Sequence, residues 1–254
     1  MSALTLNTID YGGAGDAPPL LVAHGLFGSA RNWNVIAKRL SDRGPVVSVD
    51  MRNHGDSPWS DSHSYYDLSD DLAAEIDTRA DVVGHSMGGK AAMALALRHP
   101  DKVRRLVVAD IAPVAYTHTQ MHLVEAMQKL DLSQVSRRSD ADTQLAEHVD
   151  DRGVRAFLLQ GLDVSGKAWK FNLDVLGREM DTITGWPDEL DGSFDGPALF
   201  LSGGESDYVL REYRDRIRAF FPRARFAKLP GAGHWLHAEK PRDFEASLRA
   251  FLDA

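Results

Sequence analysis

Short apolar runs and amphipathic stretches alternate through the first 110 residues of the chain. The apolar runs have the length of buried strands, and between them apolar side chains recur every three or four positions, the spacing of a helix face. The expected strands are residues 20–23, 45–49, 80–83 and 103–109, and the expected helices are residues 30–42, 66–76 and 89–97. This alternation predicts an α/β fold with a mostly parallel central sheet flanked by helices.

The alternation stops between about residues 115 and 186. Three helical patterns, over residues 121–130, 140–159 and 170–180, follow one another there with no strand between them. It then resumes with strands expected at 198–201 and 225–229 and helices at 209–221 and 242–252. We expect a core of residues 1–114 and 187–254, with a helical cap, residues 115–186, inserted after the sixth strand. A cap excludes water from a site and shapes its pocket, although helices in this place can also simply enlarge the domain.

Composition narrows the classes of protein to consider. The 254 residues suffice for one large core, and a net charge of −8 makes a nucleic-acid or anionic-membrane partner unexpected. No apolar stretch is long enough to span a bilayer. The chain has no cysteine, which excludes disulfides and cysteine catalysis. The first ten residues lack the basic and apolar regions of a signal peptide, so we expect a cytoplasmic location.

Residues 84–88 read Gly-His-Ser-Met-Gly, between the expected strand 80–83 and the expected helix 89–97. A Gly-x-Ser-x-Gly run at such a strand-to-helix junction is the pattern of a nucleophile elbow. The glycines leave room for a sharp turn that a β-carbon would obstruct. We therefore predict Ser86 as a nucleophile.

A serine nucleophile needs a base that is oriented by an acid. His234 lies in a glycine-rich loop after the last expected strand and follows Ser86 in the chain, as the order serine, acid, histidine requires. Two aspartates stand at strand ends and are candidate acids: Asp110 after strand 103–109 and Asp207 after strand 198–201. Glu205 is a weaker candidate. Histidines 24, 54, 85 and 237 are expected to be structural.

The remaining parts of the site follow from position along the chain. Backbone N–H groups of Leu26 or Phe27, together with that of Met87, could stabilise an oxyanion. Phe27, Trp169 and Trp186, with Leu26, Met121 and Met127, are candidates for an apolar pocket, although such residues more often belong to a core. The scattered histidines lack the spacing of a zinc site, and no glycine-rich run fits a nucleotide site, so neither a metal nor another cofactor is expected.

Four segments together resemble a known family: residues 24–29, 50–57, 84–90 and 231–235. They are similar to the α/β-hydrolases, and more closely to small bacterial carboxylesterases related to the mitochondrial abhydrolase-domain 11 proteins. The resemblance spans nearly the whole chain and is least specific over residues 115–186. It favours Asp110 as the acid, because in this subgroup the aspartate of the Asp-Ile-Ala-Pro-like segment can take that role. The presence of Asp207 at the usual position keeps the alternative open.

These observations predict a serine carboxylesterase that hydrolyses small to medium acyl esters through an acyl-enzyme. The same residues could instead serve thioester or carbon–carbon hydrolysis, acyltransfer or perhydrolysis, and a non-catalytic ligand-binding protein is a further alternative. The expected partner is a small-molecule ester, and the chain could be a monomer or a dimer.

Overall fold

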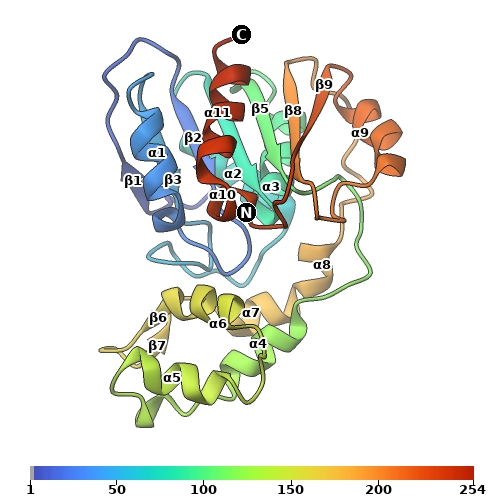
Figure 1. Ribbon diagram of the computed structural model, residues 1–254. Coiled ribbons are helices and arrows are strands. Elements are labelled where there is room, and N and C mark those ends of the chain that lie inside the picture. The colour runs from blue at the N-terminus through green and yellow to red at the C-terminus, as the bar shows by residue number, and fades with distance from the viewer. Residues whose placement is uncertain (1–2) are drawn as a thin grey trace.

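The computed structural model describes residues 3–254, whose centre is a seven-stranded sheet (Figure 1). The strand order is β1-β3-β2-β4-β5-β8-β9, and every pair is parallel except β1 with β3. The strands are β1 (Thr8–Asp10), β2 (Leu20–Ala23), β3 (Val46–Val49), β4 (Ala80–His85), β5 (Val103–Ala109), β8 (Ala198–Gly203) and β9 (Ala224–Leu229). The predicted mostly parallel α/β fold is confirmed.

Helices cover both faces of the sheet. The first face carries α2 (Tyr65–Ala74), α3 (Met87–Arg98) and, after the short helix η4 (Arg211–Tyr213), α9 (Arg214–Phe220). The second face carries η1 (Ala30–Trp33), α1 (Asn34–Leu40), α10 (Leu236–Glu239) and α11 (Pro241–Leu252).

The sheet separates two hydrophobic cores, one on each face, and neighbouring residues of a strand belong alternately to one and the other. Val82 belongs to the core under α2 and α3, whereas Val83 belongs to the core under α1 and α11. All residues of β2 and β4 are buried, because side chains that alternate across a covered sheet are enclosed on both faces. This explains why the central strands appear in the sequence as unbroken apolar runs.

The segment between β5 and β8 lies beyond one end of the sheet and contains the remaining helices and strands of the described chain (Figure 1). Its buried apolar side chains join those of α2 and α3 in one core. Its helices are α4 (Met121–Gln128), η2 (Leu132–Gln134), α5 (Arg138–Leu145), α6 (Arg152–Leu158), η3 (Leu159–Gly161), α7 (Leu173–Arg178) and α8 (Met180–Thr184), and its strands are β6 (Leu162–Asp163) and β7 (Ala168–Trp169).

Three expectations for this segment were wrong. It follows the fifth strand of the described chain, not the sixth: the sequence analysis located four strands before it, and β1 is the fifth. The expected helix over 140–159 is broken, because the Asp151 carboxylate accepts the Val154 N–H at 2.9 Å and starts a new helix. The short antiparallel pair of β6 and β7 interrupts a stretch that was expected to be entirely helical.

No helix within residues 3–254 combines the length and the apolar character that crossing a bilayer demands.

Candidate active site

Ser86 lies at the junction of β4 and α3 in a strained backbone conformation, with φ 52° and ψ −120°. The glycines on either side are required by packing. A β-carbon on Gly84 would lie 2.2 Å from the Gly88 carbonyl oxygen, and one on Gly88 would lie 2.4 Å from the His24 carbonyl oxygen. The close approach of backbones therefore excludes side chains at both positions and holds the turn in a shape that presents the serine.

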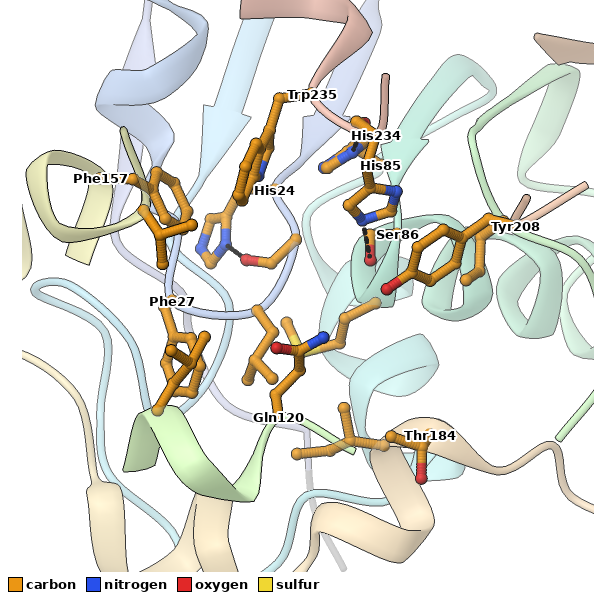
Figure 2. A pocket seen from close by; sticks show the side chains of 18 of the residues that line it. His24, Phe27, His85, Ser86, Gln120, Phe157, Thr184, Tyr208, His234 and Trp235 are labelled. Atoms are coloured by element: carbon orange, nitrogen blue, oxygen red, sulfur yellow. Dashed lines mark hydrogen bonds between the residues drawn. The ribbon is translucent and has the colours of Figure 1, made fainter. Parts of the chain in front are cut away.

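The structure brings three of the predicted residues together in one hydrogen-bonded chain, of which Figure 2 draws the Ser86 and His234 side chains. Nε2 of His234 lies 3.1 Å from Oγ of Ser86, and Nδ1 lies 2.8 Å from Oδ2 of Asp110. Because a carboxylate accepts hydrogen bonds, Nδ1 carries the proton toward Asp110 and Nε2 is left to accept the proton of the serine hydroxyl. This arrangement can raise the nucleophilicity of Ser86.

Asp110 follows β5 and has no exposed surface. Its Oδ1 accepts the Gly203 N–H at 2.9 Å, and its Oδ2 accepts the Ser206 hydroxyl at 2.5 Å besides the His234 ring. Its backbone is also in the left-handed region, at φ 53°. These donors hold one orientation of the buried carboxylate.

Asp207 lies in the same loop as Ser206 but is exposed, and no hydrogen bond or ion pair joins its side chain to any of residues 3–254. The structure therefore brings Asp110, and not Asp207, to the His234 ring. The role of Ser206 was not foreseen, because its contact with Asp110 joins residues 96 positions apart.

Two of the three candidate oxyanion donors have no acceptor. The Phe27 N–H donates to Nε2 of His54 at 3.2 Å, which removes Phe27 from that role. The N–H groups of Leu26 and Met87 meet no acceptor among residues 3–254, and both residues line the same cavity as Ser86. Leu26 and Met87 are thus the pair available to an oxyanion.

Two buried histidines brace the loop that carries Leu26. His24 accepts the Met51 N–H at Nε2 (2.9 Å) and donates Nδ1–H to the Gly25 carbonyl (2.8 Å). His54 accepts the Phe27 N–H and donates to the backbone. Burial lowers the pKa of both rings, so both remain neutral and act as fixed donors and acceptors.

Two further histidines lie beside His234. His85 donates Nε2–H to the His234 carbonyl at 2.9 Å, and burial holds its pKa well below the ordinary value. His237 stacks on Trp33 with ring centres 4.6 Å apart, and burial lowers its pKa to about 3. Both rings are neutral at pH 7, and both pack against the loop that carries His234.

A cavity of about 510 Å³ opens beside Ser86. Figure 2 shows Phe27 and Phe157 on one side of it and Tyr208 on the other. Most of its apolar lining comes from the loop after β2, from α3 and from the segment between β5 and β8. Its apolar residues include Leu26, Phe27, Trp33, Met87, Ile111, Leu123, Val149, Val154, Phe157, Ile183 and Trp235.

The expectation for the tryptophans of the pocket was wrong. Trp169 lies outside the cavity lining, stacked on Phe171, and donates its indole N–H to the Met127 carbonyl at 3.1 Å. Trp186 packs against Tyr65 and Phe220. Met121 and Met127 are also absent from the lining. These large apolar side chains fill the core, which is their commoner use.

Lys90 is a buried lysine in the cavity wall that sequence reasoning missed, although it stands one helical turn after Ser86. Its Nζ donates to the Thr184 carbonyl at 2.8 Å and to the Gly185 carbonyl, and lies 4.8 Å from the centre of the Tyr116 ring. No carboxylate among residues 3–254 pairs with it, and burial lowers its pKa to about 7. Lys90 thereby ties α3 to the end of α8.

A family model covers most of the chain. A model described as "Alpha/beta hydrolase family" matches residues 20–247. The chain belongs to this family. Among the described residues of this α/β-hydrolase, no group of three or more histidine and acidic side chains is arranged to hold a metal ion.

Similar proteins cover almost the whole hydrolase chain. A mouse (Mus musculus) protein named sn-1-specific diacylglycerol lipase ABHD11 is 43% identical, over 98% of this chain and 85% of its own. Esterase YbfF of Escherichia coli K12 is 41% identical, over 92% of this chain and 93% of its own. A solved structure described as a marine microorganism esterase superposes with a TM-score of 0.92 at 36% identity, covering 98% of this chain and 100% of its own.

Replacement of Gly88 by alanine should destabilise this α/β-hydrolase by about 2–3 kcal/mol or more, because the new methyl group would overlap backbone oxygens that cannot move away. Gly153→Ala is the matched control. A β-carbon there meets only the Asp151 carboxylate, at 3.1 Å, so its effect should stay within about 1 kcal/mol. Urea unfolding measures both. Equal stabilities of the two variants would contradict the packing argument.

Lys90→Met should change how stability depends on pH. The unfolded lysine keeps its proton up to its ordinary pKa of 10.5, whereas the folded one loses it near pH 7. Between these two pH values only the unfolded state holds this proton. Because of this lysine, the free energy of unfolding of the wild type therefore rises by up to about 1.4 kcal/mol for each unit of increase in pH. The difference in unfolding free energy, wild type minus variant, should therefore grow by about 2 kcal/mol between pH 7.5 and 9.5.

The control for this measurement is Lys129→Met, at an exposed position. It should leave the pH dependence of the unfolding free energy as in the wild type. Parallel curves for the wild type and Lys90→Met would show that burial does not hold Lys90 in its neutral form.

Proposed function

We propose that this α/β-hydrolase is a serine carboxylesterase in which Ser86 attacks the ester, His234 is the general base and Asp110 is the acid that orients it. The observation that carries the proposal is the continuous hydrogen-bonded chain from Asp110 through His234 to Ser86, at the wall of a largely apolar cavity. The names of the mouse and E. coli relatives, a lipase and an esterase, support an ester as substrate.

In the acylation step, Nε2 of His234 takes the proton of Ser86 while Oγ attacks the ester carbonyl carbon. The carbonyl oxygen gains negative charge and is stabilised by the N–H groups of Leu26 and Met87. The protonated His234 then gives its proton to the leaving alkoxide, and the acyl group remains on Ser86. Asp110 stabilises the positive charge of the ring during this step.

Deacylation repeats the same steps with water. His234 takes a proton from a water molecule, which attacks the acyl carbon of the serine ester, and the acid leaves as Ser86 regains its proton. The braced loop after β2 keeps the Leu26 donor in place, and the tightly packed turn at Ser86 keeps the Met87 donor in place, so no rearrangement is needed as charge develops.

We further propose that residues 115–186 form a cap over this site. They contribute Phe157 to one part of the cavity wall, and Gln120 and Thr184 to another (Figure 2), and Val154 also lines the cavity. A cavity of about 510 Å³ with such walls suits small to medium acyl groups.

Hydrolysis of p-nitrophenyl esters from acetyl to dodecanoyl tests the proposal. Ser86→Ala should abolish turnover without unfolding the protein, because only a hydroxyl is removed. Asp110→Asn should lower kcat by about 10³–10⁴-fold, since the amide no longer fixes the ring tautomer. Asp207→Asn, whose side chain is exposed, is the matched control and should stay within about twofold of wild type.

Undiminished turnover in Ser86→Ala would contradict the mechanism. A larger loss of kcat in Asp207→Asn than in Asp110→Asn would show that Asp207 is the acid. If no ester is hydrolysed but a fluorophosphonate labels Ser86, the triad serves another substrate, such as a thioester or a carbon–carbon bond. Absence of both turnover and labelling would leave a non-catalytic binding protein.

A further inference from the structure

The His234 ring has a stacked aromatic neighbour that the mechanism above does not use. The ring centres of Tyr208 and His234 are 4.0 Å apart and their planes differ by 20°. Figure 2 shows Tyr208 beside the imidazole, at the edge of the cavity. A stack this close and this parallel covers one face of the imidazole.

Tyr208 is itself held firmly. Its N–H donates to Oγ of Ser206 at 3.3 Å, and its carbonyl accepts the Tyr116 hydroxyl at 2.6 Å. That hydroxyl in turn accepts the Ala112 N–H at 2.9 Å. The Tyr208 ring also packs on Tyr116 and His118, with ring centres 5.3 and 4.9 Å away. The stacked face is therefore a fixed wall, anchored to the chain just beyond β5.

The imidazole meets two other rings, but neither is stacked on it: those of His85 and Trp235 are tilted, with centres 4.8 and 6.3 Å away. Its loop is fixed through the backbone, because the His234 carbonyl accepts from His85 and the Gly233 N–H donates to Glu239. The side chain is 21% exposed, and its hydrogen bonds to Asp110 and Ser86 both lie in the plane of the ring. Contacts in the plane do not by themselves prevent the ring from swinging out toward the cavity, whereas a wall against its face does.

We propose that Tyr208 is a positioning residue for the general base, which holds the His234 ring in the plane shared by Ser86 and Asp110. The inference rests on the proposed function. The tyrosine also favours the protonated intermediate, because the negative face of an aromatic ring attracts the positive charge of an imidazolium. The hydroxyl is not required for either effect, so the ring alone should suffice.

Substitutions that separate ring from hydroxyl test this. Tyr208→Phe keeps the stacked face, and Tyr208→Leu removes it. We expect Tyr208→Leu to lower kcat about tenfold with KM changed by less than about threefold, and Tyr208→Phe to stay within about twofold of wild type. The rate of Ser86 labelling by a fluorophosphonate should follow kcat, because labelling needs the same base but no substrate pocket for an acyl chain.

Leu210→Ala, at an exposed position two residues on, is the matched control and should leave both rates unchanged. Thermal melts establish that each variant folds, and Tyr208→Met replaces the leucine variant if that one does not. Wild-type labelling rates in Tyr208→Leu, or an equal loss in Tyr208→Phe, would overturn the inference while leaving the proposed function intact. A wild type without Ser86-dependent labelling would overturn both.

Discussion

A carboxylate with no exposed surface must be surrounded by hydrogen-bond donors, and this requirement at Asp110 organises the site. Its donors come from three places: the backbone at the end of β8, the hydroxyl of Ser206, and the ring of His234 from the loop after β9. Each bond joins segments far apart in the sequence. Displacement of one strand end would take one of these three donors away from the buried charge, which is destabilising because a buried charge depends on its partners.

The parallel sheet makes this convergence possible. Successive strands β4, β5, β8 and β9 are neighbours and run in the same direction, so their carboxyl ends meet at one edge. Ser86 follows β4, Asp110 follows β5 and His234 follows β9. Ser86 and Asp110 both have φ above 50°, and each follows a central strand whose packing on either side holds this strained conformation.

Much of this architecture could be predicted from the sequence, because buried parallel strands are encoded as apolar runs and the elbow as a motif. The strands flanking Ser86 and Asp110 were foreseen, as was the order of the three candidate residues. The choice between Asp110 and Asp207 could not be made from local pattern, since both follow a strand. Burial separates them, and burial depends on the whole fold. Ser206, Tyr208 and Lys90 escaped notice for the same reason, because their contacts join distant segments. The break before α6 was not foreseen, because the Asp151 side chain caps a new helix where the apolar spacing suggested that one helix continues.

The central claim is that the Asp110 carboxylate holds the His234 imidazole, and proton NMR tests it most directly. An Nδ1–H that donates to a buried carboxylate resonates far downfield and exchanges slowly with water. We expect such a signal in the wild type and in Asp207→Asn, and its loss in Asp110→Asn, where the amide replaces the charged acceptor. Loss of the signal in Asp207→Asn together with its persistence in Asp110→Asn would contradict the account.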